Sequence, residues 1–219
     1  MSLPVAPVAT GNTFDKYGSA NPLVRRMMAG FFAALDASLP GSPPRAILEV
    51  GLGEGEVSNR LRDRWPDARM VGIDLPDADL ARSWKELGLA GAYADITRLP
   101  FPDASFDLVL AIEVLEHVPD PAAAVAELQR VARGDLVLSV PREPLWRVAN
   151  MARGKYLGAW GNTPGHIQHW SSAAFTDLVR SRFRVRSVRR PVPWTMVAAA
   201  VQRPATPAGP AGPPASPRP

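Results

Sequence analysis

The sequence predicts an α/β fold, in which a mostly parallel, seven-stranded sheet carries helices on both faces and ends in a C-terminal antiparallel hairpin. Three observations predict it: apolar runs alternate with segments of helical periodicity, the early runs are apolar throughout, and a short link joins the last two runs. Apolar runs without polar alternation indicate strands that are buried on both faces, as in parallel sheets. The link RPVPW is too short for a crossover helix, so the last two strands should be antiparallel.

The predicted strands and helices alternate along the chain. The strands cover residues 45–50, 68–75, 90–95, 106–113, 135–141, 183–190 and 194–202. The helices cover residues 22–39, 54–65, 77–88, 120–134, 144–153 and 172–181. Pro22 suits the first turn of the first helix. The apolar residues that recur there at helical spacing are Leu23, Met27, Phe31, Ala34 and Leu35. The segment PGSPP at 40–44 should end that helix.

The chain is expected to form one domain over residues 13–202, with residues 13–40 as an N-terminal lid and helix. Residues 203–219, RPATPAGPAGPPASPRP, consist almost entirely of Pro, Ala and Gly and offer little to bury, so they should be a disordered tail. Residues 1–12 resemble this tail and are also expected to be disordered.

Composition excludes several classes of function. The 219 residues contain no cysteine, which excludes disulfides, thiolate catalysis and cysteine-bound metals. No apolar run reaches the roughly 18 residues of a membrane span, and the first residues do not resemble a signal peptide, so a cytoplasmic protein is expected. The net charge is +4, and RFRVRSVRR (182–190) is strongly basic. Alternation in that strand should turn its arginines to solvent, so nucleic acid binding is disfavoured.

A glycine-rich turn follows the first predicted strand. Residues 47–56 read ILEVGLGEGE, with glycines at every second position. Glycine allows a tight turn and lets a ligand lie directly on the backbone. The dinucleotide fingerprint G-x-G-x-x-G would need Gly at position 56, where the chain has Glu56. The acids around the turn disfavour a pyrophosphate and favour a cationic ligand, although a plain strand-to-helix turn would have the same sequence.

Two further acids end the next two predicted strands. Asp74 closes MVGID, where its carboxylate would accept the hydroxyls of a ribose, or would cap the following helix. Asp95 closes AYAD, where it would accept an adenine amino group, or would be an ordinary turn residue. Because the carboxyl ends of parallel strands meet at one edge, these acids and the glycine turn should form one cleft for an adenosine-containing cation.

The segments ILEVGLGEGE, VGID and FPDASFDLVLAIEVLEHVPDP together resemble the class I S-adenosylmethionine-dependent methyltransferases, which have a Rossmann-like fold. The nearest resemblance is to the small-molecule branch that includes the ubiquinone and menaquinone biosynthesis enzymes, and it is strong over about residues 45–140. It implies S-adenosyl-L-methionine as the cofactor and a small molecule as the methyl acceptor. The cofactor-binding residues that it implies are Glu49, Gly51, Gly53, Gly55, Asp74, Leu75, Asp95, Ile96, Glu113 and Val114.

Three side chains are candidates for catalysis. His117, in EVLEHV, is the first candidate for a general base or substrate ligand, and its alternative is a structural role beside the cofactor loop. His166 lies in GNTPGHIQHWS (161–171), which should form a substrate wall. Tyr17 lies in the expected lid, where it would close over the site or simply pack. His169 should cap the helix that begins near residue 171. The H-x-x-H spacing has no third ligand nearby, so no metal is expected.

Alternative functions remain open at this point. An RNA or protein methyltransferase is disfavoured, because the chain has no separate recognition domain and no Asn-Pro-Pro-Tyr-type motif after the fourth strand. A module that binds the cofactor without turnover would also carry the glycine turn and the acids. Trp146, Trp160, Trp170 and Trp194 are expected to be mainly core residues, with one or two facing the cleft. The acceptor atom (oxygen, nitrogen or carbon) and the oligomeric state are not encoded in any recognisable pattern.

Overall fold

The computed structural model describes residues 20–152, 154 and 156–202, and Tyr17 and the segments expected to be disordered lie outside them. Seven strands form a single sheet in the order β3-β2-β1-β4-β5-β7-β6. The strands are β1 (Ala46–Val50), β2 (Arg69–Asp74), β3 (Gly91–Tyr93), β4 (Phe106–Ile112), β5 (Ala132–Pro141), β6 (Phe183–Arg189) and β7 (Trp194–Val201).

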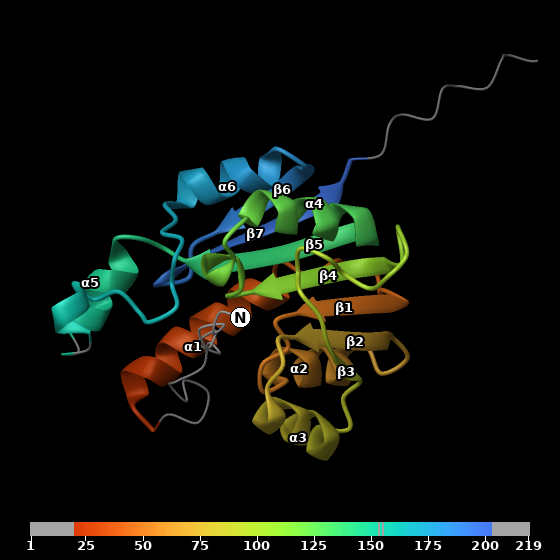
Figure 1. Cartoon of the computed structure of the whole chain (residues 1–219), viewed down its shortest axis with the longest axis horizontal. Helices are drawn as coiled ribbons and strands as arrows, with labels where there is room; N and C mark the ends of the chain where they lie inside the picture. The colour runs from red at the N-terminus through yellow and green to blue at the C-terminus, as the bar shows by residue number, and fades with distance from the viewer. Residues whose placement is uncertain (1–19, 153, 155, 203–219) are drawn as a thin grey trace, which may run out of the picture.

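Helices precede or connect most of these strands (Figure 1). They are α1 (Pro22–Asp36), α2 (Glu56–Arg64), α3 (Ala78–Leu87), α4 (Pro121–Val131), α5 (Leu145–Ala152) and α6 (Ser172–Arg180), with 3-10 turns η1 (Leu115–His117) and η2 (Leu157–Ala159). Within the described ranges, none of the helices has both the length and the apolar character that crossing a bilayer requires.

The sheet is parallel from β3 to β5 and antiparallel at its other end. The last strand, β7, pairs antiparallel with both β5 and β6, so it lies between them. The predicted C-terminal hairpin is therefore confirmed. The chain runs outward from β1 to β3 and then returns to β4, which pairs with the other side of β1. This reversal places a crevice at the carboxyl ends of β1 and β4, where open α/β sheets bind their ligands.

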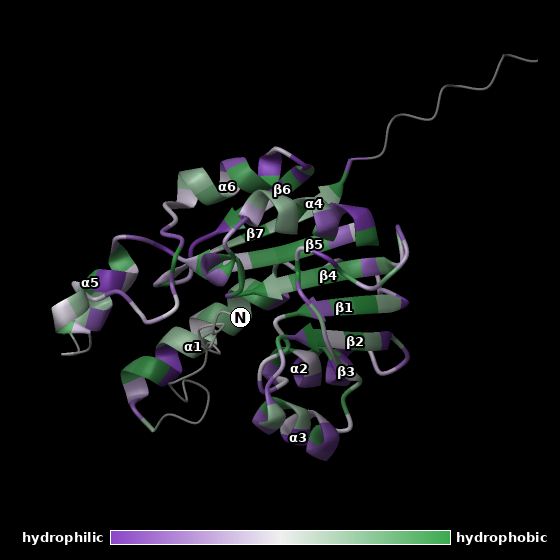
Figure 2. Ribbon diagram, viewed as in Figure 1, coloured by the Kyte–Doolittle hydropathy of each residue, from purple (hydrophilic) through white to green (hydrophobic). Residues whose placement is uncertain are grey.

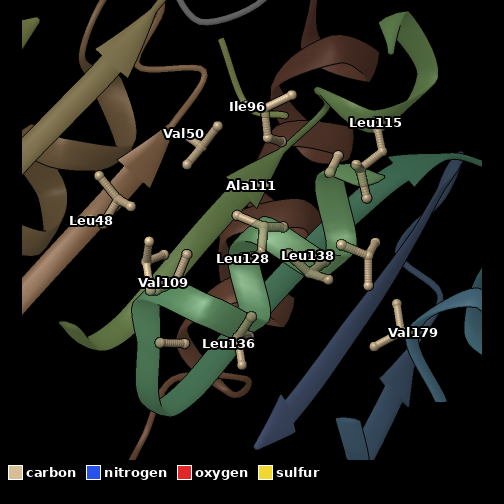
Figure 3. Packing of buried hydrophobic residues seen from close by; sticks show 14 of the residues in the cluster. Leu48, Val50, Ile96, Val109, Ala111, Leu115, Leu128, Leu136, Leu138 and Val179 are labelled. Carbon is tan, nitrogen blue, oxygen red and sulfur yellow. The ribbon is translucent and has the colours of Figure 1, made fainter. Parts of the chain in front are cut away.

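Each face of the sheet has its own hydrophobic core. One core joins α4 and α6 to side chains of β1, β4 and β5 (Figure 3). The other joins α1 and α2 to the opposite face of the same strands. Figure 2 shows the central strands as the most hydrophobic part of the molecule. Strands buried from both sides explain why residues 46–50 are apolar almost without interruption.

The buried face of α1 differs from the predicted one. Asn21 caps the helix by accepting a hydrogen bond from the Leu23 N–H, as suits a helix that begins with Pro22. The buried positions include Val24 and Met28, whereas Leu23 is 66% exposed. Phe31 and Leu35 are buried as predicted, so only the first half of the apolar stripe is shifted by one residue, which the many apolar residues of this helix permit.

The boundary between α4 and β5 was predicted too late in the chain. The helix ends at Val131 and the strand already begins at Ala132, so the expected helix end at Gly134 is wrong. Two contacts explain the early strand. The guanidinium of Arg133 donates to Asp107 at 2.6 Å, and a side chain at Gly134 would overlap the Asp107 carbonyl oxygen. Glycine is therefore needed here for close strand pairing rather than for ending the helix.

Candidate functional site

A cavity of about 820 Å³ opens at the carboxyl ends of β1, β2 and β4 and extends to α1, α5 and the loop 161–171. Figure 1 shows these strand ends pointing toward the side of the molecule on which α5 lies. Gly55 does not line the cavity, and Tyr17 is outside the described residues. All other predicted site residues line it: Glu49, Gly51, Gly53, Asp74, Leu75, Asp95, Ile96, Glu113, Val114, His117 and His166.

The glycine turn forms the floor of one end of the cavity. Gly51 has a φ of 76°, and a Cβ there would overlap the side chain of Val114. Gly53 has a φ of 51°, and no atom lies near the position that its Cβ would occupy. Its N–H donates to Asp74 Oδ2 at 2.7 Å, and its carbonyl accepts from Trp84 Nε1 at 2.7 Å. The turn is therefore held rigidly while its open side faces the cavity.

Gly55 serves the helix that follows. It is the N-cap of α2 at a φ of 86°, and a Cβ at this position would overlap the side chain of Leu89. A left-handed backbone with no room for a side chain requires glycine. Gly55 thus positions the start of α2 behind the turn without itself lining the cavity.

Glu49 is a buried carboxyl group beneath the turn. It is 2% exposed and accepts a hydrogen bond from the Ser58 hydroxyl. The pKa of Glu49 is raised to about 8, mainly by burial and in smaller part by the nearby Asp74, while the hydrogen bond from Ser58 lowers it. A carboxyl group in this state holds a proton until a cation approaches, and it then becomes a strong partner for that cation.

Asp74 and Asp95 have different surroundings. Asp74 accepts from the Leu75 N–H with its second oxygen at 2.7 Å, and the N-cap of α3 is Asp77, so the alternative role of Asp74 as a helix cap is wrong. The prediction that Asp95 ends the third strand is also wrong, because β3 stops at Tyr93. One Asp95 oxygen accepts from both the N–H and the hydroxyl of Thr97 at 2.8 Å, which fixes a turn at the cavity wall.

The chain leaves β4 through a strained residue. Glu113 has a φ of 58°, a left-handed conformation that is uncommon for residues with a side chain. Its N–H donates to the Ser139 carbonyl at 3.0 Å, so β5 holds it in place. Strained residues that line a cavity are often functional. The turn directs the chain into η1, which carries His117 at its last position.

His117 and His166 lie together, although His166 comes 49 positions later in the sequence. Their rings are 4.9 Å apart at an angle of 80°. The Nδ1 of His117 is 2.9 Å from the Gly165 carbonyl oxygen. Because a carbonyl only accepts, Nδ1 is the donor in this contact. The ring of His166 is stacked on that of Trp146 at 5.9 Å, and only 8% of the residue is exposed.

His169 does not take part in this group. Its Nε2 is 2.9 Å from Asn162 Oδ1, and the N-cap of α6 is Ser171, which accepts from the Ala174 N–H. The predicted capping role of His169 is therefore wrong. Hydroxyl side chains are among the favoured helix caps, so Ser171 was the better candidate for this position.

Aromatic side chains form the end of the cavity away from the glycine turn. Trp146 and Trp194 line it with ring centroids 5.9 Å apart, and Trp146 Nε1 donates to Thr163 Oγ1 at 2.9 Å. The buried Asn150 amide donates to the same oxygen at 3.1 Å. Trp160, by contrast, is 75% exposed. The sequence did not identify Asn150 and Thr163, since single polar residues in a helix and a loop give no recognisable pattern.

The cavity is strongly acidic, although the chain has a net charge of +4. Among the residues that the structure describes, no Lys or Arg lines it. A concentration of carboxylates in a concave surface attracts cations and repels anions. The acidic lining residues are Glu49, Glu54, Glu56, Asp74, Asp77, Asp79, Asp95, Glu113, Glu116 and Asp120.

Comparison with known sequences identifies the central part of the chain. A family model described as a methyltransferase domain matches residues 48–138. A ubiquinone biosynthesis O-methyltransferase from Hahella chejuensis is 32% identical over 165 residues, which cover 67% of this chain and 67% of that protein. A demethylmenaquinone methyltransferase from Deinococcus radiodurans is 36% identical over 116 residues, which cover 50% of this chain and 48% of that protein. This chain thus spans about half of the second relative.

Solved structures show the same fold. An S-adenosylmethionine-dependent methyltransferase from Mesorhizobium loti aligns with a TM-score of 0.62 and 21% identity, over 78% of this chain and 97% of that one. The magnesium protoporphyrin IX methyltransferase from Synechocystis, solved with bound SAH, aligns with a TM-score of 0.61 and 17% identity, over 84% and 90%. These similarities confirm the predicted Rossmann-like arrangement of strands and helices.

Proposed function

Because this chain belongs to the class I S-adenosylmethionine-dependent methyltransferases, we propose that it transfers the methyl group of its cofactor to a hydroxyl oxygen of a small molecule. The observation that carries the proposal is that one cavity has two unlike ends, one of glycines and acids and one of aromatic rings. Such a cavity holds a donor and an acceptor side by side, which is the main requirement for a direct displacement.

The cofactor is proposed to lie along the carboxyl ends of β1 to β4. Glu49 would face the ammonium of the methionine part, which lies on the open backbone of Gly51 and Gly53. Asp74 would accept the ribose hydroxyls, with the adenine held between the residues that follow β2 and β3. The charges support this placement, because the sulfonium and ammonium are positive and the surrounding carboxylates are negative. The residues proposed for the adenine and the sulfonium wall are Leu75, Asp95, Ile96, Glu113 and Val114.

The acceptor is proposed to lie against Trp146 and Trp194, with its hydroxyl near His117 and His166. Aromatic walls favour a flat or apolar molecule. With Nδ1 donating to the Gly165 carbonyl, the Nε2 of His117 would either take the hydroxyl proton or bind a cation to which the hydroxyl also binds. Oxygen is proposed as the acceptor atom because named relatives include O-methyltransferases of ubiquinone biosynthesis and of malonyl-[acyl-carrier protein]. Tyr17 stays a proposed lid residue, and the cytoplasmic location stays a prediction.

Two measurements test the proposed function. Isothermal titration with S-adenosylmethionine and S-adenosylhomocysteine should give binding of one molecule per chain. Transfer of a labelled methyl group should then occur to phenols, quinols or other hydroxyl compounds and should not occur to RNA. If the protein binds the cofactor and methylates RNA or protein but no hydroxyl compound, the proposed acceptor class is wrong.

A further inference from the structure

Three side chains able to bind a metal ion meet in the middle of the cavity. Glu116 and His117 come from η1, and His166 comes from the loop that follows α5. One ligand atom of each lies within 4.8 Å of the ligand atoms of the other two. Glu116 is 1% exposed and His166 is 8% exposed, and all three residues line the cavity. A carboxylate with two imidazoles is a donor set that binds divalent first-row metal ions.

The ring of His117 is oriented as a metal ligand would be. Its Nδ1–H donates to the Gly165 carbonyl, so Nε2 is the ring nitrogen that would bind an ion. Histidines that bind metals commonly donate their second ring nitrogen to a carbonyl in this way, because that bond fixes the tautomer and the ring plane. The acceptor carbonyl belongs to the residue immediately before His166, so the same contact connects the two imidazoles.

The backbone fixes the spacing between η1 and the loop. The carbonyl oxygen of Glu116 accepts hydrogen bonds from the N–H groups of both Ile167 and Gln168 at 3.0 Å. The side-chain amide of Gln168 donates to the Val118 carbonyl at 3.2 Å. The loop that carries His166 is therefore attached to the turn that carries the other two groups. Ligands held in place before a metal binds give a stronger site.

We infer that Glu116, His117 and His166 bind one divalent transition-metal ion, of the class of Mn²⁺, Fe²⁺ or Zn²⁺, and that this ion holds the acceptor hydroxyl. The inference rests on the proposed function and deepens it. Three protein ligands leave further coordination positions for substrate oxygens. An acceptor with two neighbouring oxygens, such as a catechol, would fill two of these positions and is the favoured substrate class.

The bound ion would generate the nucleophile. Coordination lowers the pKa of the acceptor hydroxyl, whose proton leaves to water. The oxygen then bonds to the methyl carbon while the carbon–sulfur bond breaks, and the electron pair of that bond stays on sulfur. The products are the methyl ether, neutral S-adenosylhomocysteine and one proton. Glu116 and the two histidines remain bound to the ion and are unchanged.

The metal is tested by direct binding rather than by activity. Full-chain protein, treated with a chelator that is then removed, is titrated with Mn²⁺ while the electron paramagnetic resonance signal of the free ion is followed. Binding of one ion per chain is expected, with displacement by Zn²⁺. His166→Ala and Glu116→Gln should each weaken Mn²⁺ binding by at least about tenfold, given that even supporting residues contribute about 10–100-fold.

His169→Ala is the matched control, because this imidazole lies in the same loop and contacts Asn162 instead. It should bind Mn²⁺ like the unmodified protein. The inference is overturned if the unmodified chain binds neither Mn²⁺ nor Zn²⁺, or if His166→Ala binds Mn²⁺ normally. Binding of S-adenosylhomocysteine is measured on every variant, both to show that it is folded and to separate the two proposals. If the chain binds the cofactor but no metal ion, only the inferred metal site is contradicted. If it binds the metal ion but no cofactor, only the proposed function is contradicted.

Discussion

The two ends of the cavity are built in opposite ways. The cofactor end comes from residues 49–114, which lie at or just past the carboxyl ends of the four neighbouring strands β1 to β4. The acceptor end joins α1, α5, the loop 161–171 and the first residue of β7, which are far apart in the sequence. The cofactor end is rich in acids and glycines, and the acceptor end in aromatic rings. The cofactor end therefore depends on local backbone geometry, whereas the acceptor end depends on packing between distant parts of the chain.

Gly51 is the position at which a substitution should harm the cofactor end most. Gly51→Val places a β-branched side chain at a left-handed φ and against Val114. We expect the affinity for S-adenosylhomocysteine to fall at least about 100-fold, which corresponds to about 2.7 kcal/mol. Isothermal titration measures this change. Gly41→Ala, at a position with open space, is the control and should bind normally. Normal binding by the valine variant would show that the cofactor does not lie on this turn.

The protonation of Glu49 should make cofactor binding depend on pH. Its pKa of about 8 means that the free protein holds a proton at neutral pH, whereas the bound ammonium requires the ionised form. Binding should release a proton, so the affinity should rise about tenfold per pH unit from pH 6 and level off near pH 8. Titrations in two buffers of different ionisation enthalpy measure the released proton. Glu49→Gln should abolish this pH dependence, and a flat profile for the unmodified protein would contradict the role of Glu49.

The free energy of unfolding of the free protein should change with pH in the opposite direction from the cofactor affinity. The raised pKa stabilises the free protein most below the ordinary pKa of the carboxyl group, 4.5, and this contribution is lost as the pH rises toward 8. Bound cofactor should remove the loss, because its ammonium stabilises the ionised carboxylate. Thermal unfolding at pH 6 and pH 8, with and without S-adenosylhomocysteine, measures both effects.

Asp74 should have a smaller effect than Gly51. Asp74→Ala removes the proposed ribose acceptor and also the oxygen that binds the Gly53 N–H. We expect the cofactor affinity to fall about tenfold, or about 1.4 kcal/mol. Asp177→Ala removes an exposed carboxylate on α6 that pairs with Arg180, and it should leave the affinity unchanged. If the two variants bind the cofactor equally well, Asp74 does not contact the cofactor.

The smallest effect is expected at the acceptor end. Trp146→Leu keeps an apolar side chain but removes the ring that stacks on His166. The KM of an identified acceptor should rise about fivefold, as expected for an aromatic contact of about 1 kcal/mol, while cofactor affinity stays the same. Trp160→Leu changes an exposed ring and should alter neither quantity. If Trp146→Leu weakened the cofactor instead, the division of the cavity into two ends would be wrong.

This division also explains what the sequence could predict. The strands, Asp74 and the glycine turn were predicted because each signal is local: an apolar run, an acid at its end and closely spaced glycines. Glu116 stood in the segment EVLEHV but was not identified, because its partner His166 lies 50 residues later and only the fold brings them together. His169 was assigned a capping role from its position alone, whereas its contact with Asn162 depends on how the loop folds.

The position of β7 has a consequence for how the molecule is made. This last strand lies between β5 and β6, is almost entirely buried, and begins with Trp194 at the acceptor end of the cavity. During synthesis, N-terminal parts of a chain become available for folding first. A chain that has emerged only to residue 180 therefore has every strand of the cofactor end but lacks both β6 and β7. During synthesis the strands of the cofactor end are therefore available first, and the acceptor end is completed only when β7 joins the sheet.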